Sequence, residues 1–124
     1  MSTVALTEET FVSTIQDNSI VLIDFWAEWC GPCRMFGPVF EKASNAHPDI
    51  VFGKVDTEAE QNLAGAMGIT SIPTLMAFRD GIGIYAQPGA MQSASLERLI
   101  EAIRDLDMDE VRAQIEQEQA ASAK

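Results

Sequence analysis

The sequence contains few residues that form disulfides or bind metals: two cysteines, Cys30 and Cys33, and a single histidine, His47. A small secreted domain held by disulfides usually has about four or more cysteines, and a zinc site needs about four ligands. One copy of this chain cannot complete a zinc site, and a structural disulfide across so short a loop would stabilise the fold little. The pair, spaced Cys-x-x-Cys, therefore favours redox chemistry over a structural or metal-binding role.

Basic residues are also scarce. The chain has 8 lysine and arginine residues against 19 aspartate and glutamate residues, which gives a formal net charge of −11. Such a charge repels nucleic acid and anionic lipid surfaces at long range, so neither is expected as a partner.

Long hydrophobic runs are absent. The longest apolar stretch, residues 20–27, is interrupted by Asp24 and is far shorter than the roughly 20 residues needed to cross a bilayer. The first ten residues contain neither the basic segment nor the apolar segment of a signal peptide. We therefore expect a cytoplasmic protein.

Length and hydrophobic periodicity indicate one α/β domain. The chain has 124 residues, and 47% of them are hydrophobic, which is enough for a core. Apolar, β-branched segments predict strands over residues 20–26, 50–56, 74–78 and 82–86. Helical periodicity or capping signals predict helices over residues 7–17, 33–46, 57–67 and 93–106. Because most strands are separated by helices and the last two by the turn Asp80-Gly81, we expect a mixed sheet with helices on both faces, within residues 1–106.

Residues 107–124 differ in composition from the rest and form a separate acidic tail in this prediction. The segment is rich in glutamate, glutamine and alanine, and Asp107 is a candidate helix cap. Its apolar stripe is thin, with only Met108, Val111 and Ile115. Two interpretations stay open: a solvated helix, or a surface for docking or dimerisation.

The segment Cys30-Gly31-Pro32-Cys33 lies between the end of a predicted strand and the start of a predicted helix. A helix N-terminus offers unpaired N–H groups and a partial positive charge, which favour a thiolate over a thiol. The thiolate is the attacking species in disulfide exchange. Gly31 and Pro32 would fix the loop geometry, so we expect Cys30, near the apex, to be the exposed attacker and Cys33 to be the resolving thiol.

Asp24 is an ionisable residue inside an apolar predicted strand. Burial disfavours the charged carboxylate, so its pKa should be raised, and it could exchange a proton with Cys33. A position of Asp24 at the sheet edge, or a structural pairing with Lys54 on the neighbouring strand, stays open.

Pro73 is a second anomaly, because it stands at the entrance of a core strand, where its missing N–H must be tolerated. An X-Pro bond is the one kind of peptide bond that adopts the cis form at low cost.

These residues belong to a larger pattern. Residues 24–34, with the sequence DFWAEWCGPCR, resemble the active-site signature of the thioredoxins. Residues 54–56 (KVD), 68–74 (GITSIPT) and 89–90 (GA) support the resemblance. It covers residues 3–106 and implies the thioredoxin fold.

The resemblance also implies roles for individual residues. Cys30 is similar to the family's nucleophile and Cys33 to its resolving cysteine. Asp24 is similar to the buried acid that assists proton transfer, with Lys54 as its neighbour, and Pro73 to a cis-proline that faces the disulfide. The implied substrate surface is a shallow apolar patch made by Trp29, Ile72, Pro73, Gly89 and Ala90.

The activity implied by the resemblance is the reduction of protein disulfides. The implied electron transport runs from a flavin- and NADPH-dependent thioredoxin reductase to this chain, which itself is expected to bind no cofactor. We expect a monomer that serves cell redox homeostasis. One alternative is a thiol oxidase or isomerase, which belongs in an oxidising compartment and usually has a different dipeptide between its cysteines. Another is a binding or chaperone-like subunit, suggested by the tail. Departures from the family pattern at Arg34, at Gln87-Pro88 and in the tail bear on partner choice.

Overall fold

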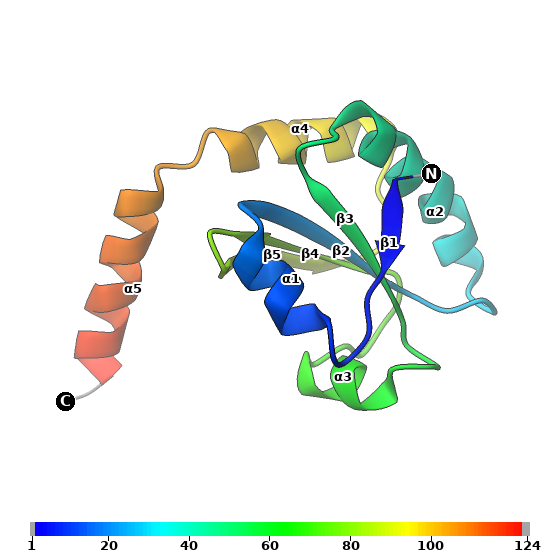
Figure 1. Cartoon of the computed structure of the whole chain (residues 1–124), viewed down its shortest axis with the longest axis horizontal. Helices are drawn as coiled ribbons and strands as arrows, with labels where there is room; N and C mark the ends of the chain where they lie inside the picture. Colours follow the sequence, from blue (N-terminus) through cyan, green and yellow to red (C-terminus); the bar gives the residue numbers. More distant parts are fainter. Residues whose placement is uncertain (1, 123–124) are drawn as a thin grey trace.

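The computed structural model describes residues 2–122, which form a central five-stranded sheet with helices on both faces (Figure 1). The strands are β1 (Thr3–Ala5), β2 (Ile20–Trp26), β3 (Val51–Asp56), β4 (Thr74–Arg79) and β5 (Ile82–Pro88). The helices are α1 (Phe11–Asp17), α2 (Gly31–Ala46), α3 (Gln61–Ala66), α4 (Ser93–Arg104) and α5 (Met108–Ser122). The sheet order is β1-β3-β2-β4-β5, with the first three strands parallel and the last two antiparallel to their neighbours. The predicted mixed α/β architecture is confirmed.

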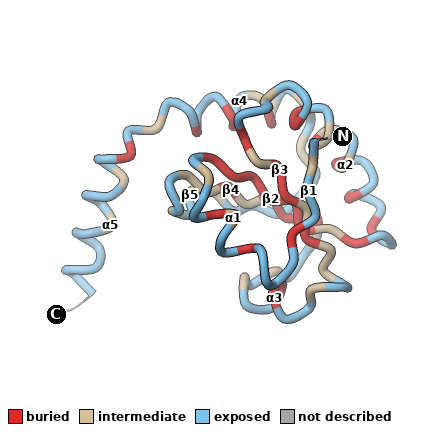
Figure 2. Tube along the Cα trace, viewed as in Figure 1, coloured by how far each residue is buried: buried red, intermediate tan, exposed pale blue. Residues whose placement is uncertain are grey.

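The central strand β2 is covered on both faces, as its continuous apolar sequence predicts (Figure 2). On one face, Leu22 packs with Phe36 and Phe40 of α2 and with apolar residues of α4. On the other face, Phe25 packs in a cluster with residues of α1 and α3. Each large side chain buried in this way contributes about 1.5–3 kcal/mol relative to an exposed one. The two clusters fix α2 and α3 against opposite faces of the sheet.

The hairpin between β4 and β5 forms where the sequence predicts it. Asp80 and Gly81 both have positive φ, +53° and +79°, as a tight two-residue turn requires. The amide N–H of Asp80 donates to the carbonyl of Ser19, which ties this turn to the start of β2. Strands 20–26, 50–56, 74–78 and 82–86 are thus confirmed within two residues at each end.

The N-terminal segment departs from the prediction in two ways. The strand β1 was not predicted; it pairs with β3 at the sheet edge. The first helix begins at Phe11 rather than at residue 7, because the Thr7 carbonyl accepts the amides of Thr10 and Phe11 in a separate turn. The chain can approach β3 here because Gly53 has no side chain, and a Cβ at that position would collide with Leu6.

The start of the third helix was also predicted too early. The predicted cap, Thr57, instead donates its hydroxyl to the carbonyl of Trp26 at 3.1 Å. The carboxylate of Asp56 accepts the amides of Glu58 and Ala59 in its place, and α3 begins at Gln61. The turn signal is present in the sequence, but it belongs to the residue before Thr57.

Helix α5 extends away from the body of the molecule (Figure 1). Asp107 caps it as predicted, since its carboxylate accepts the amides of Asp109 and Glu110. Met108 is buried against the body, and an ion pair of 2.9 Å joins Arg112 to Asp80 at the β4–β5 turn. The rest of α5 is mostly exposed, so both interpretations of the tail, and the division at residue 106, stay predictions.

Candidate active site

The two cysteines lie at the N-terminus of α2, immediately after the turn that follows β2. They form a disulfide with 5.2 Å between their Cα atoms. Cys30 is the N-cap of α2, Gly31 begins the helix, and Pro32 stands where its missing N–H has no helical partner to lose. The amide of Cys33 points at Cys30 Sγ, 3.2 Å away. A thiolate at Cys30 would therefore face an N–H donor and the positive end of a 16-residue helix.

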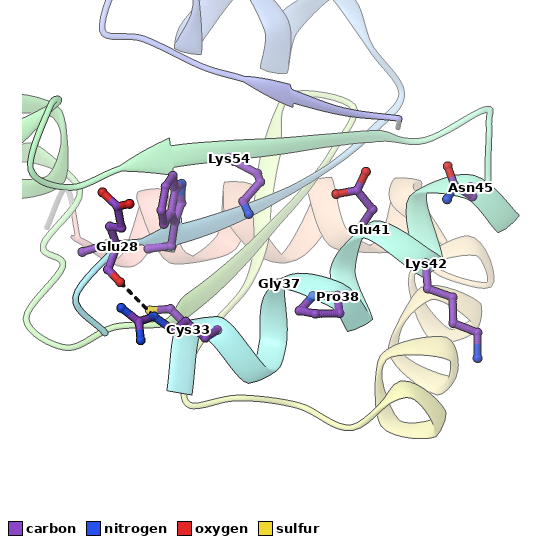
Figure 3. Close-up of a pocket in the computed structure, with 11 residues that line it drawn as sticks. Glu28, Cys33, Gly37, Pro38, Glu41, Lys42, Asn45 and Lys54 are labelled. Carbon is purple, nitrogen blue, oxygen red and sulfur yellow. Dashed lines mark hydrogen bonds between the residues drawn. The ribbon is translucent and has the colours of Figure 1, made fainter. Parts of the chain in front are cut away.

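Both cysteines are buried in this disulfide state. Cys30 is 3% exposed and Cys33 is 5% exposed, so the expectation of an exposed Cys30 is wrong here. The reason is packing, since both side chains lie in a small apolar cluster with Ala27 and Ile72. Cys30 nevertheless lines a surface groove of about 560 Å³ that also contains Trp29 and Ile72. Cys33 lines a different cavity, of about 710 Å³, between α2 and β3 (Figure 3).

Asp24 and Lys54 occupy directly paired positions of β2 and β3. Because side chains alternate along a strand, Asp24 shares the face of Leu22, which packs under α2. Asp24 has no exposed surface, and neither of its carboxylate oxygens has a hydrogen-bond partner among residues 2–122. Burial raises its pKa from 3.8 to about 7, and the positive charge of Lys54 opposes that rise in part. The raised pKa agrees with the prediction, and the alternative of a place at the sheet edge is wrong.

Lys54 does not form a close ion pair with Asp24. Within residues 2–122, no carboxylate oxygen lies within 4.0 Å of its ammonium nitrogen. Nζ lies instead 4.8 Å from the centre of the Trp26 ring, in a cation–π contact. Lys54 therefore acts on Asp24 through its field rather than through a hydrogen bond, and the structural-pairing alternative has no direct contact to support it.

Members of the expected substrate patch lie around the disulfide but differ in exposure. Trp29 is 66% exposed, and its indole N–H donates to Glu58 at 2.6 Å. Cys30 Sγ lies 3.6 Å from the carbonyl oxygen of Ile72, and the Ile72-Pro73 bond is cis, as the resemblance implies. Pro73 itself is buried, so it supports the patch more than it extends it.

Gly89 and Ala90 are brought to the same region from the end of β5. The amide of Gly89 donates to the carbonyl of Pro73 at 2.8 Å, and φ of Gly89 is +107°, which only glycine adopts readily. Both residues are exposed, and they line a separate hollow together with Gln87 and Pro88. The departure Gln87-Pro88 thus lies beside the expected substrate surface.

Two site residues were not predicted. Glu58 orients Trp29 from 29 positions away, and no local pattern marks it. Glu41, on α2, lines the same cavity as Cys33 and Lys54, and its Oε1 is buried with no hydrogen-bond partner in the part of the chain that the structure describes. The helical periodicity around Glu41 shows on which face of the helix it lies, but the sequence does not show that this face lies opposite Lys54.

The site is a dithiol–disulfide centre by its own chemistry. Within the described residues, no three side chains of the histidine, cysteine, aspartate or glutamate type are grouped as metal ligands. Over the same residues, no helix is long and apolar enough to span a membrane. A reversible disulfide at a helix N-terminus, with a buried acid of pKa near 7 on the adjacent strand, can exchange electrons and protons with other thiols.

Comparison with known proteins agrees with this chemistry. The family sequence model described as Thioredoxin matches residues 2–102. A protein named Putative thioredoxin 2 from Streptomyces coelicolor is 60% identical over 119 residues, which cover 96% of this chain and 89% of that protein. Thioredoxin 1 from Synechococcus elongatus is 41% identical over 99 residues, covering 78% of this chain and 92% of that protein.

Solved structures give the same result. A mutant thioredoxin from Halobacterium salinarum superposes with a TM-score of 0.77 at 35% identity, covering 84% of this chain and 91% of that one. Plasmodium falciparum thioredoxin gives a TM-score of 0.74 at 34% identity, covering 81% of this chain and 97% of that one. The chain belongs to the thioredoxin family and is a thiol–disulfide oxidoreductase with protein-disulfide reductase activity at the Cys30–Cys33 centre.

Proposed function

We propose that this protein reduces disulfides of other proteins in the cytoplasm and is itself reduced again by a flavin- and NADPH-dependent thioredoxin reductase. The observation that carries the proposal is the position of Cys30, which caps α2 and faces the Cys33 amide while it lines an open groove. An N–H donor and a helix N-terminus stabilise a thiolate, and the groove gives a substrate access to it.

The first step is attack by the Cys30 thiolate on one sulfur of the target disulfide. A bond forms between Cys30 Sγ and that sulfur, the target's S–S bond breaks, and the other target sulfur leaves as a thiolate. In the second step Cys33 loses its proton and attacks Cys30 Sγ. The mixed disulfide breaks, the second target thiolate leaves, and the Cys30–Cys33 bond holds the oxidised protein. Two electrons pass to the target in each cycle.

Asp24 is the proposed acceptor of the Cys33 proton. A buried carboxyl with a pKa of about 7 is matched to proton exchange near neutral pH. Lys54 stabilises the charged form of this carboxyl through its field. Within residues 2–122 no protein group hydrogen-bonds the carboxylate of Asp24, so no such contact breaks when it takes the proton, which supports this role.

The proposed substrate surface consists of Trp29, Ile72, Pro73, Gly89 and Ala90. Exposure of Trp29 and the groove beside Cys30 support docking of an extended chain across the disulfide. The net charge of −11 supports protein partners over nucleic acid or anionic membranes. We propose that the protein acts as a monomer, needs no bound cofactor, and transports electrons from the reductase in cell redox homeostasis.

The test is insulin reduction with dithiothreitol as the electron source, comparing wild type with Cys30→Ser and Cys33→Ser. The two variants are a matched pair, because each loses the same disulfide. Wild type should turn over and Cys30→Ser should add nothing to the rate with dithiothreitol alone. Reduced Cys33→Ser, mixed with insulin after the dithiothreitol is removed, should stop as a covalent mixed disulfide that mass spectrometry detects. Equal turnover by wild type and Cys30→Ser would contradict the proposal.

Recycling is tested separately with a purified bacterial thioredoxin reductase and NADPH. Oxidation of NADPH should require both the wild-type chain and an insulin acceptor. NADPH oxidation that does not depend on the chain would contradict this part of the proposal, while the insulin result would stand.

A further inference from the structure

Lys54 reaches across the space between β3 and α2, where it has no close anionic partner among the described residues. Its Nζ lies 3.9 Å from the point that a Cβ would occupy on Gly37 of α2. On the other side it contacts the ring of Trp26. An ammonium has three donors, and a half-buried one without an acceptor can move toward whichever carboxylate is charged.

Glu41 faces the same space from α2. It stands one helical turn beyond Gly37, and residues four apart lie on the same face of a helix. Figure 3 shows Glu41 extending from α2 on the side where Lys54 enters the cavity from β3. Oε1 of Glu41 is buried and has no hydrogen-bond partner within residues 2–122, and a buried carboxylate oxygen is unfavourable unless a cation neutralises it.

Lys54 is the cation best placed for that purpose. Arg34 and Lys42 also line the cavity, but both are exposed, and Arg34 donates its Nε to the carbonyl of Glu28 at 3.1 Å. A solvated cation at the rim neutralises a buried oxygen less than a half-buried one does.

The other acids near Lys54 already have partners or are exposed. Glu28 lines the cavity but is exposed. Asp56 and Glu60 line a neighbouring cavity with Lys54. Asp56 accepts two backbone amides, and Oε1 of Glu60 accepts the amide of Glu8 at 2.8 Å. Among the described residues, Glu41 and Asp24 are therefore the two acids around Lys54 that have buried oxygens without hydrogen-bond partners.

We propose that Glu41 is a positioning residue of the reaction: its carboxylate competes with Asp24 for Lys54 and receives the ammonium when Asp24 takes the proton of Cys33. When Asp24 is charged, Lys54 is drawn to it. When Asp24 is neutral, Glu41 stabilises the ammonium in the same cavity. Glu41 thereby favours the protonated form of Asp24, and this inference rests on the proposed role of Asp24 as proton acceptor.

The first test is the titration of the Asp24 carboxyl carbon by NMR in the oxidised protein. Glu41→Gln keeps the side-chain shape and removes its charge, so the full charge of Lys54 acts on Asp24 and its titration midpoint should fall by roughly half to one pH unit. The matched control is Glu116→Gln, which removes one negative charge from an exposed position of α5 and should leave the midpoint unchanged. Glu41→Ala should give a shift in the same direction as Glu41→Gln.

A double-mutant cycle then shows whether Lys54 carries the effect. In a Lys54→Gln background, Glu41→Gln should no longer move the midpoint of Asp24. An unchanged midpoint in Glu41→Gln alone, or an equal shift with and without Lys54, would overturn the inference. Glu41→Asp keeps the charge, so its Asp24 midpoint should differ from the wild-type value by less than half of the shift seen in Glu41→Gln.

A kinetic readout connects the coupling to the reaction. The rate at which Cys33 resolves a preformed mixed disulfide depends on pH. The midpoint of this pH profile should move to lower pH in Glu41→Gln and stay unchanged in Glu116→Gln. Equal profiles for Glu41→Gln and wild type would refute the role of Glu41 in the reaction. Failure of the wild type to reduce insulin would refute the proposed function instead, and the carboxyl titration does not depend on that activity.

Discussion

Replacing Asp24 with asparagine should remove a large part of the pH dependence of stability. The side chain has no exposed surface, and no group of residues 2–122 hydrogen-bonds either oxygen. Burial raises its pKa from 3.8 to about 7, with Lys54 opposing the rise. In the unfolded chain the carboxyl is solvated, and its pKa returns to the ordinary value.

The sign follows from the number of protons that each state binds. Between pH 3.8 and about 7 the folded protein holds the Asp24 proton while the unfolded chain has lost it. Because the folded state binds more protons, its stability falls as the pH rises through this window and levels off above it. The whole effect is about 4 kcal/mol, of which about 3 kcal/mol falls between about pH 5 and pH 8.

The assay is urea unfolding of the oxidised wild type and of Asp24→Asn at the two ends of that range. Oxidised protein is used so that Cys30 and Cys33 do not titrate. From the acidic to the alkaline pH, wild type should lose about 3 kcal/mol more unfolding free energy than the variant. Taking the difference of the two losses cancels the pH-independent effect of burying an amide. Equal losses in the two proteins would refute the reasoning, because they would mean that Asp24 is ionised throughout.

Three further predictions concern stability and substrate binding. Gly53→Ala should lower the unfolding free energy by about 1–3 kcal/mol in urea, since its Cβ would displace Leu6 and loosen β1; an unchanged midpoint would contradict this. Arg79→Met should lower the thermal midpoint through a loss of about 1.5–3 kcal/mol, because Nη1 of Arg79 binds three carbonyl oxygens at the end of α4. Gly89→Ala should raise KM for insulin more than it lowers kcat, because its φ of +107° strains a side chain and its amide holds the Pro73 carbonyl; a loss confined to kcat would argue against this placement.

The central part of the fold could be predicted because its signals are local and strong. The strand β2 is apolar on both faces, and the hairpin turn at Asp80-Gly81 needs two residues that tolerate positive φ. The strand β1 has only three residues and pairs with β3 alone, so it produces no pattern before β3 is in place. Its formation depends on the absence of a side chain at Gly53, which is a long-range property.

Errors at helix ends have the same origin. Thr7 and Thr57 both match a capping pattern, yet each is used in a turn that precedes the helix. Several short polar side chains near a helix start can accept or donate to the backbone, and tertiary packing decides which of them does so. At Asp107, where nothing precedes the helix but a short connection, the local signal alone was sufficient.

The chemical centre was predictable as far as it is contiguous in sequence. Cys30, Cys33 and Asp24 lie within ten positions, and each is unusual in its own segment. The exposure of Cys30 was wrong because apolar contact with Ile72, 42 positions away, covers its sulfur. The position of Cys30 in a loop does not by itself show that a distant residue buries its sulfur.

Desolvation of the Asp24 carboxylate affects both the stability of the protein and its chemistry. The same desolvation that lowers stability at neutral pH brings the pKa of the carboxyl to about 7, where it can exchange a proton with a thiol. A salt bridge with Lys54 would remove the destabilisation, but it would also hold the carboxylate charged and prevent it from taking the proton. In the mechanism that we propose, the separation between Lys54 and Asp24, with Glu41 as a second acid lining the cavity of Lys54, keeps the proton affinity of Asp24 in the useful range. Any substitution that brings Lys54 closer to Asp24 should therefore raise stability and slow the second step of the reaction together.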